Sequence, residues 1–134
     1  MIVADTNVIA SLWVPNDMDE IAYKLLKTDA DWVAPLYWRS EFRSVTTKYL
    51  RAELLSFSAI VEVIQEAEML MKDKEFEVNS TRVLKLVSES NCSSYDCEFV
   101  ALADDLDVKL ATFDKKIRRE FSDIALHPKE FFNE

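Results

Sequence analysis

Short apolar segments alternate with longer amphipathic segments along this chain, and this alternation is the feature that most restricts its fold. The short segments are too brief for helices and have the length and composition of buried strands. Strands that are separated by helices form parallel sheets, because parallel pairing needs a crossover connection. The sequence therefore predicts an α/β fold with a central, mainly parallel sheet and helices on both faces. The expected strands are residues 2–4, 31–34, 108–113 and 124–126.

Seven helices are expected between these strands, because apolar residues recur there at helical spacing. Two follow the first strand, four follow the second, and one follows the third. The length of 134 residues suits one domain, so we expect residues 1–134 to form a single unit. The expected helices are residues 6–13, a segment capped by Asp17, residues 38–49, 57–71, 81–90, 94–106 and 115–121.

Composition excludes several classes of protein. The net charge of −9 argues against a surface that coats nucleic acid, so any such contact must be local. The absence of glycine excludes Walker-type and dinucleotide-binding phosphate loops. Two cysteines, Cys92 and Cys97, are too few for a disulfide scaffold or a thiolate zinc site. With no apparent signal peptide or membrane segment, we expect a cytoplasmic protein.

Four acidic residues stand at positions where a structural role does not fully explain them. Asp5 and Asp114 each follow a predicted strand, and open α/β sheets bind ligands at the carboxyl ends of their strands. Helix capping is an equally good explanation for each of these two taken singly. Glu41 lies at the border of an apolar helix stripe, where a carboxylate needs a partner. Asp96 lies in the first turn of a helix, where a capping role is the simpler explanation.

Taken together, these acidic residues are expected to converge on one edge of the sheet. Two carboxylates about 5 Å apart repel each other by about 3 kcal/mol at an effective dielectric near 20. That repulsion amounts to roughly two pKa units, so a cluster of four requires a neutralising cation. All-oxygen ligands favour Mg²⁺ or Mn²⁺, which can activate water for phosphodiester hydrolysis.

Four segments of the chain form a pattern that extends over nearly its whole length: residues 3–7 (VADTN), 38–41 (WRSE), 94–103 (SYDCEFVALA) and 110–114 (LATFD). With these segments, the sequence resembles the PIN-domain nucleases, and most of all the small VapC-type toxin ribonucleases. The Tyr-Asp helix followed by Thr-x-Asp is the most specific part of the resemblance. Glycines that are frequent in this family near Asn91 and Asp107 are missing, although Asn and Asp tolerate the left-handed conformation.

The resemblance implies a metal-dependent ribonuclease that acts on RNA and pairs with an antitoxin protein. It assigns the four acidic residues above to a catalytic site that binds Mg²⁺ or Mn²⁺. Asn7 and Thr112 would orient the carboxylates or a water molecule. A PIN-like module that binds RNA or protein without cleaving it is the alternative. A receiver-like signalling domain is disfavoured, because residues 51–71 are predicted helical and contain no aspartate.

Basic residues are concentrated near two of the acidic positions and are candidates for phosphate contacts. A solvated helix face explains them equally well. The only histidine, His127, is interpreted as structural, because no second histidine or serine supports a nucleophilic triad. The tryptophans are expected in the core or an interface. The candidate nucleic-acid-binding residues are Arg39, Arg43, Lys115, Lys116 and Arg119.

A homodimer is also expected. The helix predicted at 57–71 has apolar residues beside its main stripe, at Ala59, Val63 and Leu70, and these exceed what one core-facing stripe needs. The resemblance to VapC-type toxins points the same way.

Overall fold

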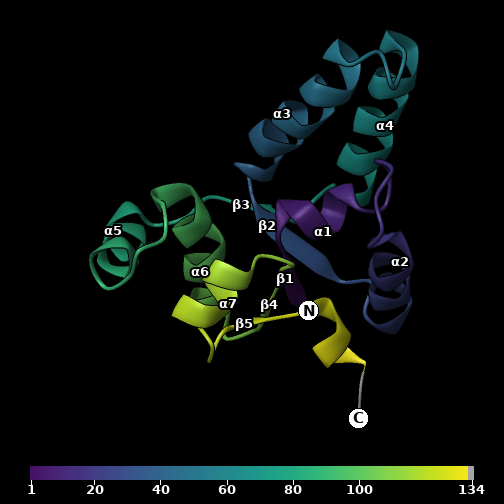
Figure 1. The fold of residues 1–134 in the computed structure, drawn as a ribbon. Helices are drawn as coiled ribbons and strands as arrows, with labels where there is room; N and C mark the ends of the chain where they lie inside the picture. The colour runs from purple at the N-terminus through teal and green to yellow at the C-terminus, as the bar shows by residue number, and fades with distance from the viewer. Residues whose placement is uncertain (133–134) are drawn as a thin grey trace.

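A parallel sheet forms the centre of the computed structural model, which describes residues 1–132. Its strands pair in the order β3-β2-β1-β4-β5, and every pairing is parallel (Figure 1). The predicted parallel α/β architecture is therefore confirmed. The strands are β1 Ile2–Ala4, β2 Trp32–Pro35, β3 Glu75–Phe76, β4 Leu110–Ala111 and β5 Ala125–Leu126.

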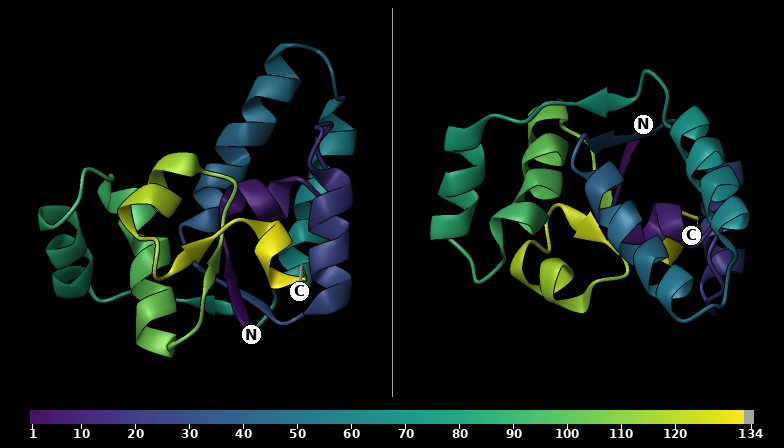
Figure 2. Two further views of the ribbon diagram at one scale, coloured as in Figure 1. Left: turned by 60° about the horizontal axis from the view of Figure 1, so that its bottom comes forward. Right: turned by 90° about the horizontal axis from the view of Figure 1, so that it is seen from above.

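Helices cover both faces of this sheet. Figures 1 and 2 show α1 to α4 on one side and α5 to α7 on the other. The chain runs outward from β1 through β2 to β3 and then crosses back to β4, so the covering helices change face between β1 and β4. The helices are α1 Thr6–Ala10, α2 Asp19–Thr28, α3 Trp38–Arg51, α4 Phe57–Leu70, α5 Ser80–Ser88, α6 Ser94–Leu106 and α7 Lys115–Glu120, followed by the 3₁₀ helix η1 Pro128–Phe131.

The expected order of elements was wrong in one place, because β3 is a strand that the sequence pattern did not predict. It has only two residues, and it pairs with β2 alone at the edge of the sheet. Neither residue is fully buried, so no apolar run marks the segment. Such a short edge strand depends on pairing with its neighbour rather than on its own composition.

Three other predicted boundaries also need correction. The first helix ends at Ala10 instead of residue 13, and the second begins at Asp19 without a cap from Asp17. The side chain of Asn16 bonds the backbone carbonyls of Ser11 and Val14, which holds this segment in a loop. The strand expected at 108–113 pairs only over β4.

The core lies between the sheet and α6, and it fixes the positions of the strand ends. All three residues of β1 are buried, and α6 packs on β1, β2 and β4. Trp32 and Trp38 are fully buried, as expected for core tryptophans. Within residues 1–132, no helix is both long enough and apolar enough to cross a membrane.

Residues other than glycine take the left-handed conformation in this chain. Asp107 ends α6 with a φ of 55°, as expected for an aspartate in place of a glycine. Glu53 and Asp73 also have positive φ values, of 57° and 64°. Asn91 is not among the residues with positive φ, so the left-handed turn expected there was wrong.

Candidate functional site

One pocket at the carboxyl end of the sheet brings together the four acidic residues that the sequence singled out. Asp5 follows β1, Glu41 lies on α3, Asp96 lies in the first turn of α6, and Asp114 follows β4. The pocket has a volume of about 270 Å³. It lies where the helices on the two faces diverge, which is the usual ligand crevice of an open parallel sheet. Its remaining lining residues are Thr6, Asn7, Tyr37, Ser44 and Val45.

Asp5 is the most deeply buried of these carboxylates, with 6% of its surface exposed. One carboxylate oxygen accepts the Thr6 backbone N–H at 2.7 Å, and the other accepts the Thr112 hydroxyl at 2.7 Å. Burial raises the pKa of Asp5 to about 7, and the negative charges of Glu41 and Asp96 add to the increase. Asp5 therefore caps α1 and also lines the pocket, so capping does not exclude a second role for it.

Glu41 reaches the pocket because α3 packs against α1. The hydroxyl of Thr6 donates to Oε1 of Glu41 at 2.7 Å, which leaves Oε2 free for another partner. Burial raises the pKa of Glu41, and the charges of Asp96 and Glu98 raise it further. This carboxylate therefore has a neutral hydrogen-bond donor and acidic neighbours.

Asp96 and Asp114 both sit at helix N-termini. Ser93 caps α6 by accepting the backbone N–H of Asp96 at 3.1 Å. Oδ1 of Asp114 accepts the backbone N–H groups of Lys116 and Ile117 at 2.8 and 3.2 Å and so caps α7. Burial raises the pKa of Asp96, and the charge of Asp114 contributes. Capping thus accounts for one oxygen of Asp114 and leaves Oδ2 for the pocket.

A hydrogen-bond network joins the ends of β1 and β4. Thr112 donates its hydroxyl to Asp5 and accepts the backbone N–H of Asp114 at 3.0 Å. The side chain of Asn7 donates to the Thr112 hydroxyl at 3.4 Å and accepts the backbone N–H of Phe113 at 3.3 Å. The structure therefore places Asn7 and Thr112 where they hold two acidic residues in position.

Among residues 1–132, no lysine or arginine forms an ion pair with a carboxylate of the acidic pocket. Across residues 1–132, no three acidic, histidine or cysteine side chains already lie close enough to hold a metal ion. The donor set is nevertheless all oxygen and strongly negative, which fits a hard divalent cation. Mg²⁺ commonly keeps several waters and takes only one or two carboxylates directly, so such a pocket can hold it without three converging ligands.

The predicted basic residues lie in three different surroundings. Arg39 forms two hydrogen bonds with Glu75, at 2.6 and 2.8 Å, so its guanidinium is already paired. Arg43 lines a groove between α3 and α4 and does not line the acidic pocket. Three others are exposed on α7, next to Asp114; they are Lys115, Lys116 and Arg119.

Sequence reasoning missed two side chains that shape the acidic pocket. Thr6 was not among the predicted site residues, yet its hydroxyl holds Glu41. Tyr37 lines the pocket and stacks on Tyr95, with ring centroids 4.7 Å apart and an interplanar angle of 17°. The position of Thr6 between Asp5 and Asn7 was the available signal for the first. Nothing in the spacing pairs the two tyrosines.

His127 has the structural role that was expected for it. Its Nδ1 accepts the backbone N–H of Lys129 at 3.1 Å, and the residue caps η1. The ring also contacts Phe113 edge-on, at 5.3 Å between centroids. His127 therefore fixes the C-terminal turn against the end of β4.

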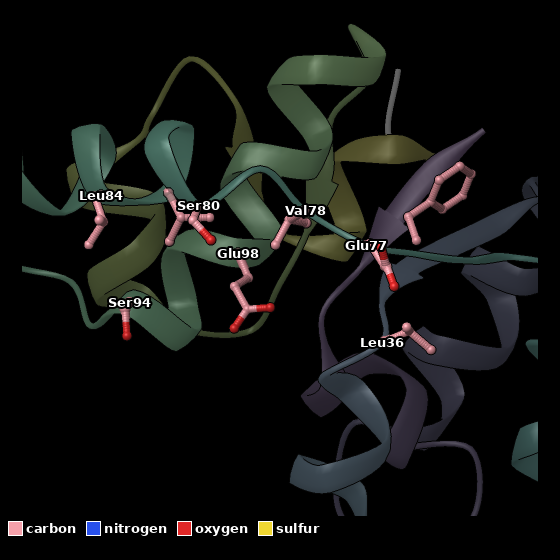
Figure 3. Close-up of a pocket in the computed structure, with 9 residues that line it drawn as sticks. Leu36, Glu77, Val78, Ser80, Leu84, Ser94 and Glu98 are labelled. Carbon is pink, nitrogen blue, oxygen red and sulfur yellow. The ribbon is translucent and has the colours of Figure 1, made fainter.

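A second pocket, of about 510 Å³, lies between α6 and the segment that joins β3 to α5. Figure 3 shows Glu98 from α6 directed into it between Leu36 and Leu84. Its walls are largely apolar, and the four acidic residues of the first pocket are absent from it. The acidic pocket is therefore the better candidate for a catalytic site.

Comparisons with known proteins agree with this architecture. The family model described as PIN domain matches residues 2–120. The crystal structure of FitAcB from Neisseria gonorrhoeae has a TM-score of 0.75 at 18% identity, covering 96% of this chain and 99% of that one. A structure of FitAB bound to the IR36 DNA fragment has a TM-score of 0.72 at 18% identity, covering 100% and 98% of the two chains. No curated protein matches the sequence.

Proposed function

The chain belongs to the PIN domain family, and from this premise we propose that it is a divalent-metal-dependent endoribonuclease that hydrolyses RNA phosphodiester bonds. PIN domains are generally nucleases that use divalent metals. The observation that carries the proposal is the convergence of four carboxylates from separate segments in one pocket without a protein cation. Such a cluster stabilises a bound cation and destabilises the protein without one.

The four acidic residues act together as metal ligands in the proposed site, and two hydroxyls hold them in position. Asp5, Glu41, Asp96 and Asp114 would hold Mg²⁺ or Mn²⁺, which when bound activates water and stabilises negative charge on a phosphate. Thr112 fixes one oxygen of Asp5, and Thr6 fixes one oxygen of Glu41. These hydroxyls keep the carboxylates oriented toward the pocket, as second-layer donors do in metal sites.

Contacts with RNA phosphates come from the exposed basic residues of α7. Lys116 is close enough to Asp96 that its positive charge opposes the rise in the pKa of that carboxyl. Lys115 and Arg119 are exposed on the same helix. Because the rest of the protein is acidic, these side chains give a phosphate its most favourable approach to the pocket. Arg39 and Arg43 contribute at longer range from α3.

The partner in this proposal is an antitoxin protein, and the chain is the toxin of a toxin–antitoxin pair in the cytoplasm. The resemblance to VapC-type toxins supports this assignment, and so does the likeness in fold to FitAB. A homodimer is part of the same proposal. Phe57 and Met69 on α4 are each 70% exposed, which supplies apolar surface for a second copy. A monomeric mass by light scattering at micromolar concentration would contradict the dimer.

Cleavage of labelled RNA with and without Mg²⁺ or Mn²⁺ tests the enzymatic proposal. Wild type is expected to cleave only with metal, and Asp96→Asn is expected to be inactive. Asp105→Asn is the matched control, because Asp105 lies on the same helix with a side chain that is 68% exposed. Full metal-dependent cleavage by Asp96→Asn would overturn the site assignment. Metal-independent RNA binding without cleavage by wild type would favour the silent PIN-like module instead.

A further inference from the structure

A pair of stacked tyrosines stands beside the acidic pocket. Tyr37 lines that pocket from the turn before α3, and Tyr95 immediately precedes Asp96 on α6. Their rings are nearly parallel, with centroids 4.7 Å apart. Tyr95 is 54% exposed even though one face of its ring lies against Tyr37. The pair therefore presents aromatic surface next to one of the proposed catalytic carboxylates.

The hydroxyls of these two tyrosines differ from those of the other tyrosines in the chain. Tyr23 donates to the carbonyl of Leu12 at 2.8 Å, and Tyr49 donates to the carbonyl of Pro15 at 3.1 Å. Within residues 1–132, neither Tyr37 nor Tyr95 has a hydrogen bond from its hydroxyl. Holding the fold together therefore explains the first two tyrosines and does not explain the pair at the pocket.

We propose that Tyr95, supported from behind by Tyr37, is a stacking platform for an unpaired base of single-stranded nucleic acid whose phosphates lie along α7, beside the acidic pocket. This inference rests on the proposed function for the position of the phosphate. Every nucleobase has a flat face that stacks on an aromatic ring, so the platform binds single strands with little sequence preference. Bases within a duplex are already stacked on their neighbours and are not available to Tyr95.

The charges around the tyrosine pair favour this arrangement. Tyr37 lies near several carboxylates, and burial together with the charge of Glu41 raises the pKa of its hydroxyl. A phosphate cannot approach this side of the pocket favourably, whereas an uncharged base can. Lys116 and its basic neighbours on α7 lie near Asp96 and can receive the backbone. A bound strand then has its phosphates toward α7 and one base on Tyr95.

Binding of fluorescein-labelled 12-nucleotide probes in EDTA tests the platform without requiring cleavage. The probes are oligoadenylate and oligouridylate as RNA and as DNA, together with a duplex of the same length. Tyr95→Ala is expected to weaken binding of the single strands by about 5- to 30-fold, because stacking on one base accounts for an effect of that size. Tyr95→Phe should bind within about two-fold of wild type, because it keeps the aromatic ring. The RNA and DNA arms show which of the two backbones the pocket accepts.

Tyr23→Ala is the matched control, because Tyr23 is an exposed tyrosine on α2, which lies on the other side of the molecule from α6 (Figure 1). Tyr95→Leu keeps an apolar side chain against Tyr37, so equal weakening by Tyr95→Leu and Tyr95→Ala, with unchanged melting temperatures, supports stacking. Single-strand affinity of Tyr95→Ala equal to wild type would overturn the inference. An equal loss of duplex binding would also overturn it.

A fully abasic 12-nucleotide probe separates this inference from the proposed nuclease activity. Wild type should bind it more weakly than the oligoadenylate probe, and Tyr95→Ala should bind the two probes alike. That result supports the platform even if wild type cleaves no RNA. Cleavage by wild type with equal affinity for the two probes would leave the nuclease proposal standing and overturn the platform.

Discussion

Two carboxylates of the central sheet have opposite surroundings: Glu75 lies on the edge strand β3, and Asp5 follows the central strand β1. Glu75 on β3 accepts hydrogen bonds from the Arg39 guanidinium at 2.6 and 2.8 Å and from the Trp38 indole at 2.7 Å. Its pKa is lowered, chiefly by the hydrogen bonds from Arg39. Asp5 is also buried, but its neighbours are other carboxylates, and its pKa is raised to about 7.

The charge of Glu75 stabilises the fold through its ion pair with Arg39. The charge of Asp5 has no such partner in the described part of the chain, so fold stability does not explain why this carboxylate is buried. The ion pair of Glu75 favours the folded chain, because the arginine replaces the water that the carboxylate loses. The acidic pocket has no such cation among residues 1–132, so burying its charges costs stability. A protein tolerates that cost where an external cation supplies the missing positive charge.

Replacing Asp5 by Asn should have the largest effect, which is on RNA cleavage. Removing one ligand from a shared metal site is expected to lower the rate by roughly 10²- to 10⁴-fold. The measurement is the single-turnover rate with saturating Mn²⁺ or Mg²⁺. Replacing Glu75 by Gln should leave cleavage within about three-fold of wild type if the contrast between the two carboxylates holds.

Replacing Arg39 by Met should give the next largest effect, a loss of stability. It leaves Glu75, with a side chain only 11% exposed, without its cation, and should cost about 1–3 kcal/mol after allowing for the partial exposure of Arg39. The lowered pKa of Glu75 means that this stabilisation is present above its unfolded pKa and is lost as pH falls through the folded value. Urea denaturation at neutral and acidic pH measures both effects.

Arg82 provides the control for this experiment, because its ion pair with Asp104 lies on the surface. Arg82→Met should change the free energy of unfolding by no more than about 0.5 kcal/mol. Equal destabilisation by the two arginine variants would show that burial of Glu75 adds nothing.

The acidic pocket should make the free energy of unfolding depend on pH in the direction opposite to that of the Glu75–Arg39 ion pair. A raised pKa means that the folded protein prefers protonated Asp5, so the contribution of Asp5 to stability falls as pH rises from 3.8 to about 7. The pKa shift alone would make metal-free Asp5→Asn more stable than wild type by roughly 4 kcal/mol near pH 7.5 and about equal to it near pH 4. The altered hydrogen bond to Thr112 costs about 1.5–3 kcal/mol, so we expect a net gain of about 1–2 kcal/mol near pH 7.5. Urea denaturation across this range in EDTA checks the sign, and a less stable variant at neutral pH contradicts it.

The smallest expected effect is stabilisation by metal. An ion that binds only the folded protein, at about ten times its dissociation constant, stabilises it by about 1.4 kcal/mol. This should raise the melting temperature of wild type by a few degrees, and Asp5→Asn should lose most of the rise. Thermal melts with Mg²⁺ or Mn²⁺ provide the measurement. An equal metal-induced rise in the melting temperatures of wild type and Asp5→Asn would show that the ion binds elsewhere.

The sequence predicted the parts of this protein that depend on apolar patterning or on strand ends. Apolar runs located β1, β2, β4 and β5, and the residues that follow β1 and β4 meet in one pocket. It did not predict β3, because two half-buried residues at a sheet edge carry no apolar pattern. The reason is that β3 forms through pairing with β2, which is a long-range contact.

Contacts between side chains of distant segments also could not be predicted from the sequence. Arg39 was predicted to bind phosphate because of its charge, and the structure pairs it with Glu75, 36 residues away. The stacking of Tyr37 on Tyr95 depends on how α3 and α6 approach each other across the sheet. Spacing along one helix cannot give such pairs, since they depend on the relative placement of two elements.

The pairing of β1 with β4 determines when the acidic pocket can form during translation of the chain. Thr112 and Asp5 are hydrogen-bonded across 107 residues of chain, and β4 occupies the place beside β1 at the centre of the sheet. A nascent chain that ends before β4 lacks Asp114 and leaves one side of β1 unpaired. It has Asp5, Glu41 and Asp96 but no closed pocket. The complete acidic pocket therefore cannot form until translation has passed Asp114, and the slow closure of long-range strand contacts extends that interval.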